Sequence, residues 1–189
     1  MSTVKSKKLQ VGTDASASNN FTIYQPATPD GTLRIGVGNA DSPTEVGQFN
    51  ANGYKAASPI IFAAKKTTGQ SISAATWTKV VFEAESFDYG SGFDLSNDKF
   101  VVPVTGIYVL NYHLRVNAGT DNYFSFSING TRDYYWQERR STSDTITGTT
   151  SQLISLTQND YVECYAYTAN AGTITGTQNY FSGHLLHQI

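Results

Sequence analysis

Large apolar side chains recur at every second position along much of the chain. The clearest case is the run IYVLNYHLRV at residues 107–116, in which Tyr108 and every second residue after it are apolar or aromatic. Because successive side chains of a β-strand point to opposite faces, this run predicts a long strand with one face in a core. No window holds three helical turns free of glycine, proline or dense serine and threonine, so we expect an all-β chain with almost no helix.

The strand pattern divides the chain near residue 58. Before that point the predicted strands are short and are separated by turn sequences such as Pro29-Asp30-Gly31. They cover residues 21–24, 33–37, 45–49 and 53–55. A segment with so few large apolar side chains cannot bury enough surface to be stable alone. We therefore expect residues 1–58 to form a trimeric stalk that folds around copies of itself.

Residues 59–189 contain longer runs rich in aromatic and β-branched residues. The predicted strands are 60–64, 77–82, 100–104, 107–116, 123–128, 133–139, 149–156, 161–168, 172–175 and 180–186. Regular strands with glycine and asparagine turns between them, and no helices, predict an antiparallel jelly-roll sandwich with its own core.

Aromatic residues between Phe82 and Tyr112 follow the spacing F-x5-D-x4-F-x6-F-x5-G-x-Y-x-L-x-Y. This spacing resembles the signature of the complement C1q globular head, a member of the tumour-necrosis-factor-like jelly rolls. Leu110 is the one departure, because the family prefers phenylalanine at that position. The sequences SING, NDYV and FSGHLL, at 127–130, 159–162 and 181–186, resemble later parts of the same head in the same order. The resemblance covers residues 59–189 and implies a ten-strand jelly-roll head that forms homotrimers.

The first 58 residues resemble the shaft-proximal segments of bacteriophage tail and head fibres, in phrases such as KLQVGTDASASNNFTIYQP. That resemblance implies a viral fibre, located in the virion and attached to other virion proteins. Its head would bind a bacterial surface receptor, either a glycan or an outer-surface protein. Two alternatives stay open: a secreted, extracellular C1q-type ligand from a cell, and a structural virion decoration protein without a receptor.

Composition and charge exclude several other classes of function. Lys and Arg number 13 against 15 Asp and Glu, a net charge of -2, so the chain lacks the basic footprint of a nucleic-acid binder. The longest apolar run, at 59–64, is far shorter than the roughly 20 residues of a membrane-spanning helix, and we expect no membrane insertion. Cys164 is the only cysteine, which excludes an intrachain disulfide, and its alternation with Val162 and Ala166 predicts a buried core position.

Catalytic and metal-binding patterns do not stand out. We find no nucleophile with an adjacent base and no evident carboxylate pair, so we expect no enzymatic activity. His184 and His187 are three residues apart, a spacing that in a regular strand points two rings to opposite faces and prevents shared metal binding. We expect no cofactor. Calcium is the one possibility left open, through Asp121 and Asp144, although it needs about six to eight oxygen ligands.

Receptor binding has two sets of candidate residues. If the last strand ends beside the stalk, as the family resemblance implies, antiparallel counting places the turns at Asn129 and Asn159 at the stalk end. The connections 117–122, 139–148 and 169–178 then lie at the free apex. These apical loops are long and polar, as receptor-binding loops tend to be, and hold Asp121, Asn122, Arg139, Arg140, Asp144 and Asn170.

The second set is Tyr134 and Trp136, which precede the two arginines of the apical loop. Flat aromatic faces next to planar guanidinium groups are typical of sites for sugars and acidic groups. The alternative for these two rings is packing at a trimer interface.

Overall fold

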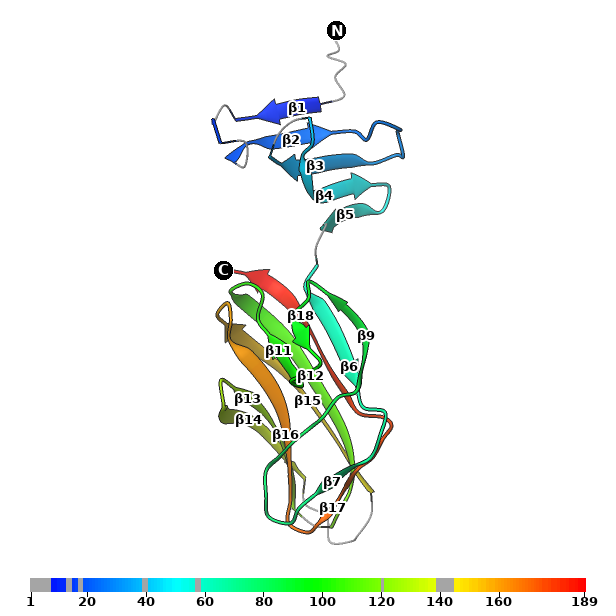
Figure 1. Ribbon diagram of the computed structural model, residues 1–189, viewed down its shortest axis with the longest axis vertical. Helices are drawn as coiled ribbons and strands as arrows, with labels where there is room; N and C mark the ends of the chain where they lie inside the picture. Colours follow the sequence, from blue (N-terminus) through cyan, green and yellow to red (C-terminus); the bar gives the residue numbers. More distant parts are fainter. Residues whose placement is uncertain are drawn as a thin grey trace. The chain divides into compact units, whose positions relative to one another are not determined.

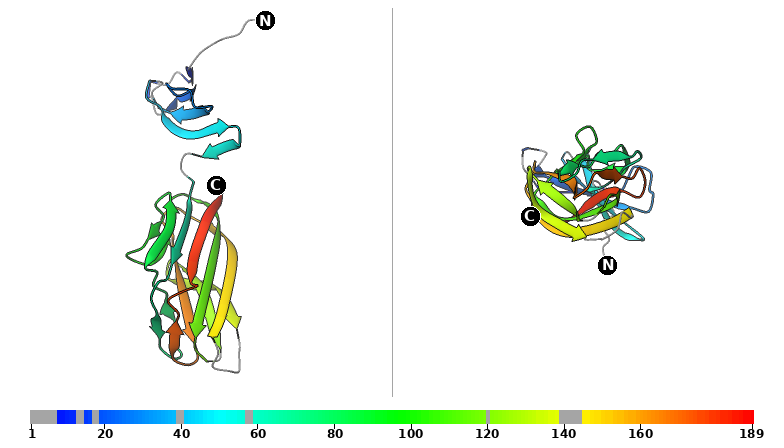
Figure 2. Two further views of the ribbon diagram at one scale, coloured as in Figure 1. Left: turned by 90° about the vertical axis from the view of Figure 1, so that its right-hand side faces the viewer. Right: turned by 90° about the horizontal axis from the view of Figure 1, so that it is seen from below.

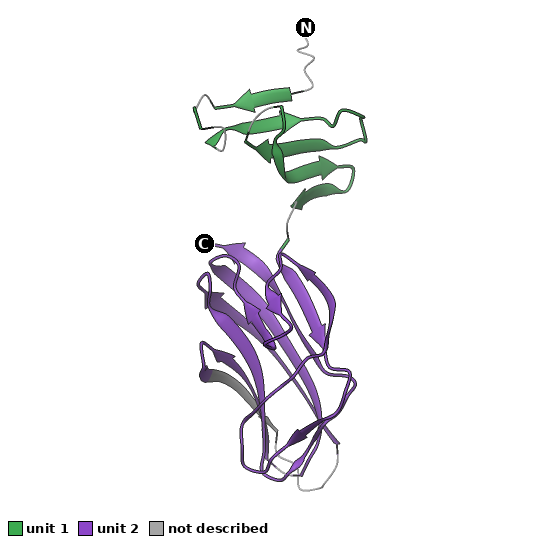
Figure 3. Cartoon of the chain, in the orientation of Figure 1, with its two compact units in different colours: residues 1–59 green, residues 60–189 purple. Residues whose placement is uncertain are grey.

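The computed structural model describes residues 8–12, 15–16, 19–38, 41–56, 59–119, 121–138 and 145–189, with residues 133–138 described by their backbone alone. The chain splits into two compact units, Met1–Pro59 and Ile60–Ile189, which we call the N-terminal unit and the head (Figure 3). The described residues form β-strands and contain no α-helix, which confirms the prediction of an all-β chain.

The N-terminal unit is an antiparallel sheet whose five strands follow chain order (Figure 1). They are β1 (Lys8–Val11), β2 (Phe21–Tyr24), β3 (Leu33–Val37), β4 (Thr44–Asn50) and β5 (Gly53–Ala56). The predicted turn before β3 forms as expected: Gly31 has φ +79°, and the Asp30 carboxylate accepts hydrogen bonds from the amide and the hydroxyl of Thr32. The sequence pattern did not predict β1.

The head packs two antiparallel sheets face to face, and its jelly-roll fold is as predicted (Figure 2). One sheet has the order β7-β17-β12-β18-β6-β9, with β15 also paired to β12. Its strands are β6 (Ile61–Lys65), β7 (Gln70–Ile72), β9 (Ala84–Tyr89), β12 (Gly106–Asn117), β15 (Thr145–Leu156), β17 (Gly172–Ile174) and β18 (Tyr180–Gln188).

The other sheet has the order β10-β11-β16-β13-β14, with β8 also paired to β16. Its strands are β8 (Thr78–Lys79), β10 (Phe93–Asp94), β11 (Lys99–Val101), β13 (Asn122–Ile128), β14 (Thr131–Glu138) and β16 (Tyr161–Thr168). Each of the ten predicted strands has a counterpart, and the structure adds the strands β7, β9 and β10.

Only Thr78 and Lys79 of the predicted strand 77–82 form a strand, because the backbone that follows them leaves the sheet. After Val80, the amide of Val81 donates to the side-chain oxygen of Gln70, and the amide of Phe82 donates to the carboxylate of Asp98. Side chains thus replace the neighbouring strand as hydrogen-bond partners, which an alternating sequence pattern does not reveal.

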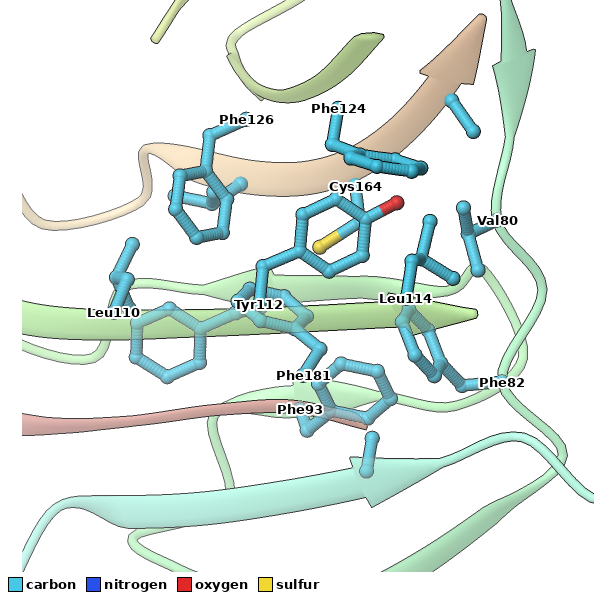
Figure 4. Packing of buried hydrophobic residues seen from close by; sticks show 14 of the residues in the cluster. Val80, Phe82, Phe93, Leu110, Tyr112, Leu114, Phe124, Phe126, Cys164 and Phe181 are labelled. Atoms are coloured by element: carbon cyan, nitrogen blue, oxygen red, sulfur yellow. The ribbon is translucent and has the colours of Figure 1, made fainter. Parts of the chain in front are cut away.

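The core lies between the two sheets, and the aromatic signature supplies much of it (Figure 4). On β12 the predicted inward face is confirmed, since Tyr108, Leu110, Tyr112 and Leu114 are all buried. The signature phenylalanines stack with rings from other strands, and the centroids of Phe62 and Phe100 lie 4.4 Å apart. The remaining buried rings of the cluster are those of Phe82, Phe93, Phe124, Phe126 and Phe181.

Cys164 is buried in this core, as predicted (Figure 4). Burial raises the pKa of its thiol well above the ordinary value, so the thiolate is disfavoured. The residue is therefore a small packing group and not a reactive thiol.

Candidate functional site

The chain enters and leaves the head at one end, which we call the proximal end. The amide of Leu185 donates to the carbonyl of Ile60 over 3.0 Å, so the last strand runs beside the start of the first. The amide of Ile189 donates to the carbonyl of Thr105 over 3.3 Å, just before β12 begins.

Two tight turns also lie at the proximal end. The amide of Gln158 donates to the hydroxyl of Thr105 over 3.0 Å, which places the turn at 159–160 there. The Asn129 side chain in turn donates to the Asp160 carboxylate over 2.8 Å. These turns lie where strand counting placed them.

The opposite, distal end of the head contains the described residues of the connections 117–122 and 169–178. Asn117 at the end of β12 pairs with Thr145 at the start of β15. The amide of Ala169 donates to the carbonyl of Asp121 over 3.2 Å and joins the two connections. Both connections lie at the end that strand counting assigned to them, and their role in binding stays a prediction.

The predicted apical residues have different environments. Asn170 is exposed, whereas Asp121 is half-buried, with a backbone φ of +54°. Arg139, Arg140 and Asp144 lie outside the described residues.

Asn122 is a correction to the predicted site. Its side chain is fully buried, and its amide nitrogen donates to the carbonyl of Gly119 over 2.8 Å. It shares the inward face of β13 with Phe124, because side chains two residues apart in a strand point the same way. Its expected place on a receptor-binding surface is therefore wrong, and it stabilises the loop from inside.

His184 and His187 also differ from expectation. A β-bulge on β18 pairs His184 with Val109 and His187 with Ile107, and these two partners lie on the same face of β12. Directly paired residues share a face, so the two histidines lie on the same face and not on opposite faces. Within the part of the chain that the structure describes, they belong to no group of three or more potential metal ligands.

The expectation of no cofactor, with calcium left open, stays untested. Asp121 alone of the two proposed carboxylates is described, and no cluster of three His, Cys, Asp or Glu side chains occurs among the described residues.

An aromatic cluster beside the distal loops was missed by the sequence pattern. The ring centroids of Trp77 and Tyr167 lie 5.6 Å apart, those of Tyr123 and Tyr167 lie 5.5 Å apart, and all three rings are half-buried. The amide of Ala75 donates to the carbonyl of Thr168 over 2.8 Å, which anchors Trp77 near the distal end of β16. We call these three rings, with Tyr165 and Arg132, the Trp77 cluster.

Arg132 extends this cluster with a cation. Its guanidinium carbon lies 5.3 Å from the centre of the Trp77 ring and 5.4 Å from the centre of the Tyr165 ring, within cation–π range. Burial, helped by the neighbouring carboxylate of Glu163, raises the pKa of the Tyr165 hydroxyl, so it stays a neutral donor. Aromatic faces, phenol hydroxyls and a guanidinium together suit a sugar or an acidic group.

One feature of β16 could have revealed this cluster. Its sequence YVECYAYT places small or β-branched residues on the inward face and Tyr161, Glu163, Tyr165 and Tyr167 on the outward face. Three large aromatic rings on the outward face of a strand are unusual for a surface that only meets water.

Tyr134 and Trp136 lie on β14, where their backbones pair with those of Phe126 and Phe124. Their side chains are outside the described residues, so the role proposed for them stays a prediction.

Comparison with known proteins identifies the fold of the head. The family model of the C1q domain matches residues 61–186. The globular domain of zebrafish complement 1qA has a TM-score of 0.54 and 14% identity, covering 69% of this chain and 99% of its own. Murine APRIL at pH 5.0 has a TM-score of 0.57 and 15% identity, covering 68% of this chain and 99% of its own.

A third solved structure, Eiger TNF from S. frugiperda, has a TM-score of 0.57 and 10% identity, covering 70% of this chain and 95% of its own. At these identities the likeness shows the fold alone. No curated protein matches the chain in sequence. Among the described residues, no helix is long and apolar enough to cross a membrane.

Proposed function

Because the chain belongs to the C1q domain family through residues 61–186, we propose that it is a homotrimeric fibre protein whose head binds a receptor on a host cell surface. C1q and tumour-necrosis-factor-like domains typically form homotrimers and bind receptors, and they are generally binding modules without enzymatic activity. Three identical heads strengthen a weak contact, because the second and third sites bind at high local concentration once the first is occupied.

The Trp77 cluster carries this proposal at the residue level, and it favours a glycan as the recognised part of the receptor. Its half-buried rings lie next to the distal connections and away from the end where the chain enters. Sugars stack their apolar faces on aromatic rings, and Arg132 offers a fork of donors to an acidic sugar or a hydroxyl pair.

The N-terminal unit supports a place in a bacteriophage virion. Residues 1–59 form a unit that lies before the part matched by the C1q domain, and their sequence resembles fibre shafts. In this proposal the N-terminal unit leads to other virion proteins, and the receptor lies on the bacterial surface.

A secreted C1q-type ligand from a cell is the second candidate. The match of residues 61–186 to the C1q domain is compatible with this candidate as well. The two candidates differ in the surface that the head binds, so one experiment separates them.

Binding of the purified full chain to a glycan array, to bacterial cells and to animal cells tests the proposal. Binding to bacterial cells together with a defined set of glycans is the expected result. Binding to animal cells alone would instead support the secreted ligand. A chain that binds neither cell type nor any glycan would be a structural decoration protein, and the proposal would be wrong.

A further inference from the structure

One face of the N-terminal sheet is almost entirely apolar. Directly paired residues of neighbouring strands share a face, so the strand register groups the side chains without further assumption. Thr44, paired with Val37, and Gly47, paired with Ile35, also lie on this face. We call its apolar side chains the apolar face: Leu9, Val11, Phe21, Ile23, Leu33, Ile35, Val37, Phe49, Tyr54 and Ala56.

Most of the large side chains of the apolar face are exposed in the single chain, and the others are half-buried. Six of them have between 45 and 60% of their surface in contact with solvent, namely Leu9, Val11, Phe21, Leu33, Phe49 and Tyr54. Such a contiguous patch is uncommon on a surface that stays in water.

Two aromatic rings of the apolar face contact each other at an angle of 51° between their planes. The ring centroids of Phe49 and Tyr54 are 5.2 Å apart. A Cβ at Gly47 would come within 2.5 Å of the Tyr54 ring, so glycine at this position lets the ring lie over the strand. The Tyr54 ring therefore covers the backbone at Gly47 on this face.

The opposite face of the same sheet is polar. It carries Lys8, Gln10, Thr22, Tyr24, Arg34, Glu45, Gln48 and Lys55. At its centre the Arg34 guanidinium binds the carboxylates of Asp30 and Glu45 over 2.6 and 3.0 Å. A sheet with one polar and one apolar face is half of a sandwich, and its apolar face needs a second layer.

The described part of the N-terminal unit does not supply that layer. Its buried residues are Asn20, Thr22, Gly36 and Gly47, none of which is a large apolar residue. The hydrophobic core cluster consists only of head residues. A unit of this size without a core is not stable by itself.

We propose that the apolar face is the surface through which three copies of the sheet β1 to β5 pack against one another. The inference rests on the proposed homotrimer, whose heads hold three copies of the N-terminal unit at high local concentration. In a threefold assembly the same patch of each chain faces the axis, and this face is suited to that because it carries no charge to repel its copies. The edge strands β1 and β5 carry Lys8 and Lys55, which disfavour the alternative of edge-to-edge pairing.

Neighbouring residues of one strand point to opposite faces, so cysteine variants at such pairs give a matched test of the apolar-face contact in the full chain. Val11→Cys places a thiol on the apolar face, and Gln10→Cys places one on the polar face of the same strand. Phe49→Cys and Gln48→Cys repeat the comparison on β4, and the natural Cys164 is buried. Under mild oxidation we expect interchain disulfides from the two apolar-face variants and none from the polar-face variants, read on a non-reducing denaturing gel. Maleimide should label the polar-face thiols at least tenfold faster.

A second pair of variants tests whether this contact holds the N-terminal unit together. Val11→Glu with Phe49→Glu should raise hydrogen exchange of the β2 to β4 amides at least tenfold, whereas Gln10→Glu with Gln48→Glu should leave it within twofold of the parent. An exposed face would tolerate both pairs equally, and that result would overturn the proposal.

Sedimentation of each variant separates this inference from the proposed homotrimer. A monomeric parent chain would contradict both. A trimeric parent in which Val11→Cys neither cross-links nor is protected from maleimide would contradict the apolar-face contact alone. Receptor binding plays no part in these measurements.

Discussion

Tyr108 shows how one side chain can serve both the core and the backbone of the head. Its ring is buried, with its centroid 5.6 Å from that of Phe100. Its hydroxyl donates to the carbonyl of Val104 over 2.7 Å, just before β12 begins. The ring therefore packs between the sheets while the hydroxyl fixes the start of the longest signature strand.

Two substitutions at this position separate the two contributions. Tyr108→Ala should lower the free energy of unfolding by about 3 to 5 kcal/mol, because it leaves a cavity where a buried ring was. Tyr108→Phe removes only the hydrogen bond and should cost about 0.5 to 1.5 kcal/mol. Chemical denaturation measures both. An alanine variant that melts within a degree or two of the parent would contradict the core position.

Glu83 makes the stability of the head depend on acid pH. Partial burial raises the pKa of its carboxyl. Hydrogen bonds from Lys66, Thr67 and Thr68 together outweigh this effect and bring the pKa from 4.5 down to about 2. The Lys66 side chain is itself buried. A carboxylate with a lowered pKa contributes stability that is fully present above the unfolded pKa and is lost as the pH falls through the folded pKa.

We therefore expect the unfolding free energy of the head to decline between pH 4.5 and about 2, partly through Glu83. Glu83→Gln should flatten this decline and lower stability at neutral pH, because it leaves the buried Lys66 ammonium without its carboxylate partner. Glu85→Gln, at an exposed position two residues away, serves as the control. Urea unfolding across this pH range measures the slope, and an unchanged slope in Glu83→Gln would contradict the assignment.

At the scale of the element, the alternation of apolar and polar residues predicts a strand correctly where the register of that strand is regular. β12 and β16 were predicted to within one residue because both alternate without interruption. The alternation fails where a β-bulge shifts the register, as between the partners of Ile107 and Tyr108, where the shift brings His184 and His187 to one face. The Trp77 cluster was missed for a related reason, since its rings come from three separate segments and only the fold brings them together.

The two ends of β16 give a matched test of the Trp77 cluster. Tyr167 and Tyr161 share the outward face of the strand, but Tyr167 belongs to the cluster, whereas Tyr161 lies at the proximal end beside Lys99. If the cluster binds the receptor, Tyr167→Ala should weaken binding by about 2 kcal/mol per site, or roughly thirtyfold. Tyr161→Ala should leave it unchanged. Binding of single heads to an immobilised glycan would measure this, and equal losses in both variants would place the site elsewhere.

Two glycines test how closely the strands of the head approach. A Cβ at Gly106 would lie 2.5 Å from the carbonyl oxygen of His187 on the neighbouring strand, whereas a Cβ at Gly69 would meet its nearest atom at 3.5 Å. Gly106→Ala should therefore destabilise the head by about 1 to 3 kcal/mol, because backbone atoms must move. Gly69→Ala should stay within about 0.5 kcal/mol of the parent. Thermal melting compares the two, and similar melting points would contradict the close approach.

At the scale of the whole molecule, the proposed homotrimer predicts resistance to dilution. Packing of the apolar face and avidity for a receptor both require three copies of the chain. We therefore expect a trimer that persists at nanomolar concentration. Mass photometry measures the mass of each particle directly. A stable monomer would show that the chain acts alone, and the fibre proposal would then fail.

The shared position of the two chain ends of the head also has a mechanical consequence. β6 follows directly from the point where the chain enters and is hydrogen-bonded on both edges, to β18 and to β9, at five residue pairs on each side. Tension between the N-terminal unit and a receptor held at the distal loops would pull β6 along its own axis. The hydrogen bonds on both edges of β6 would then be loaded together in shear and would not break one after another. A head loaded in this way would resist unfolding under tension.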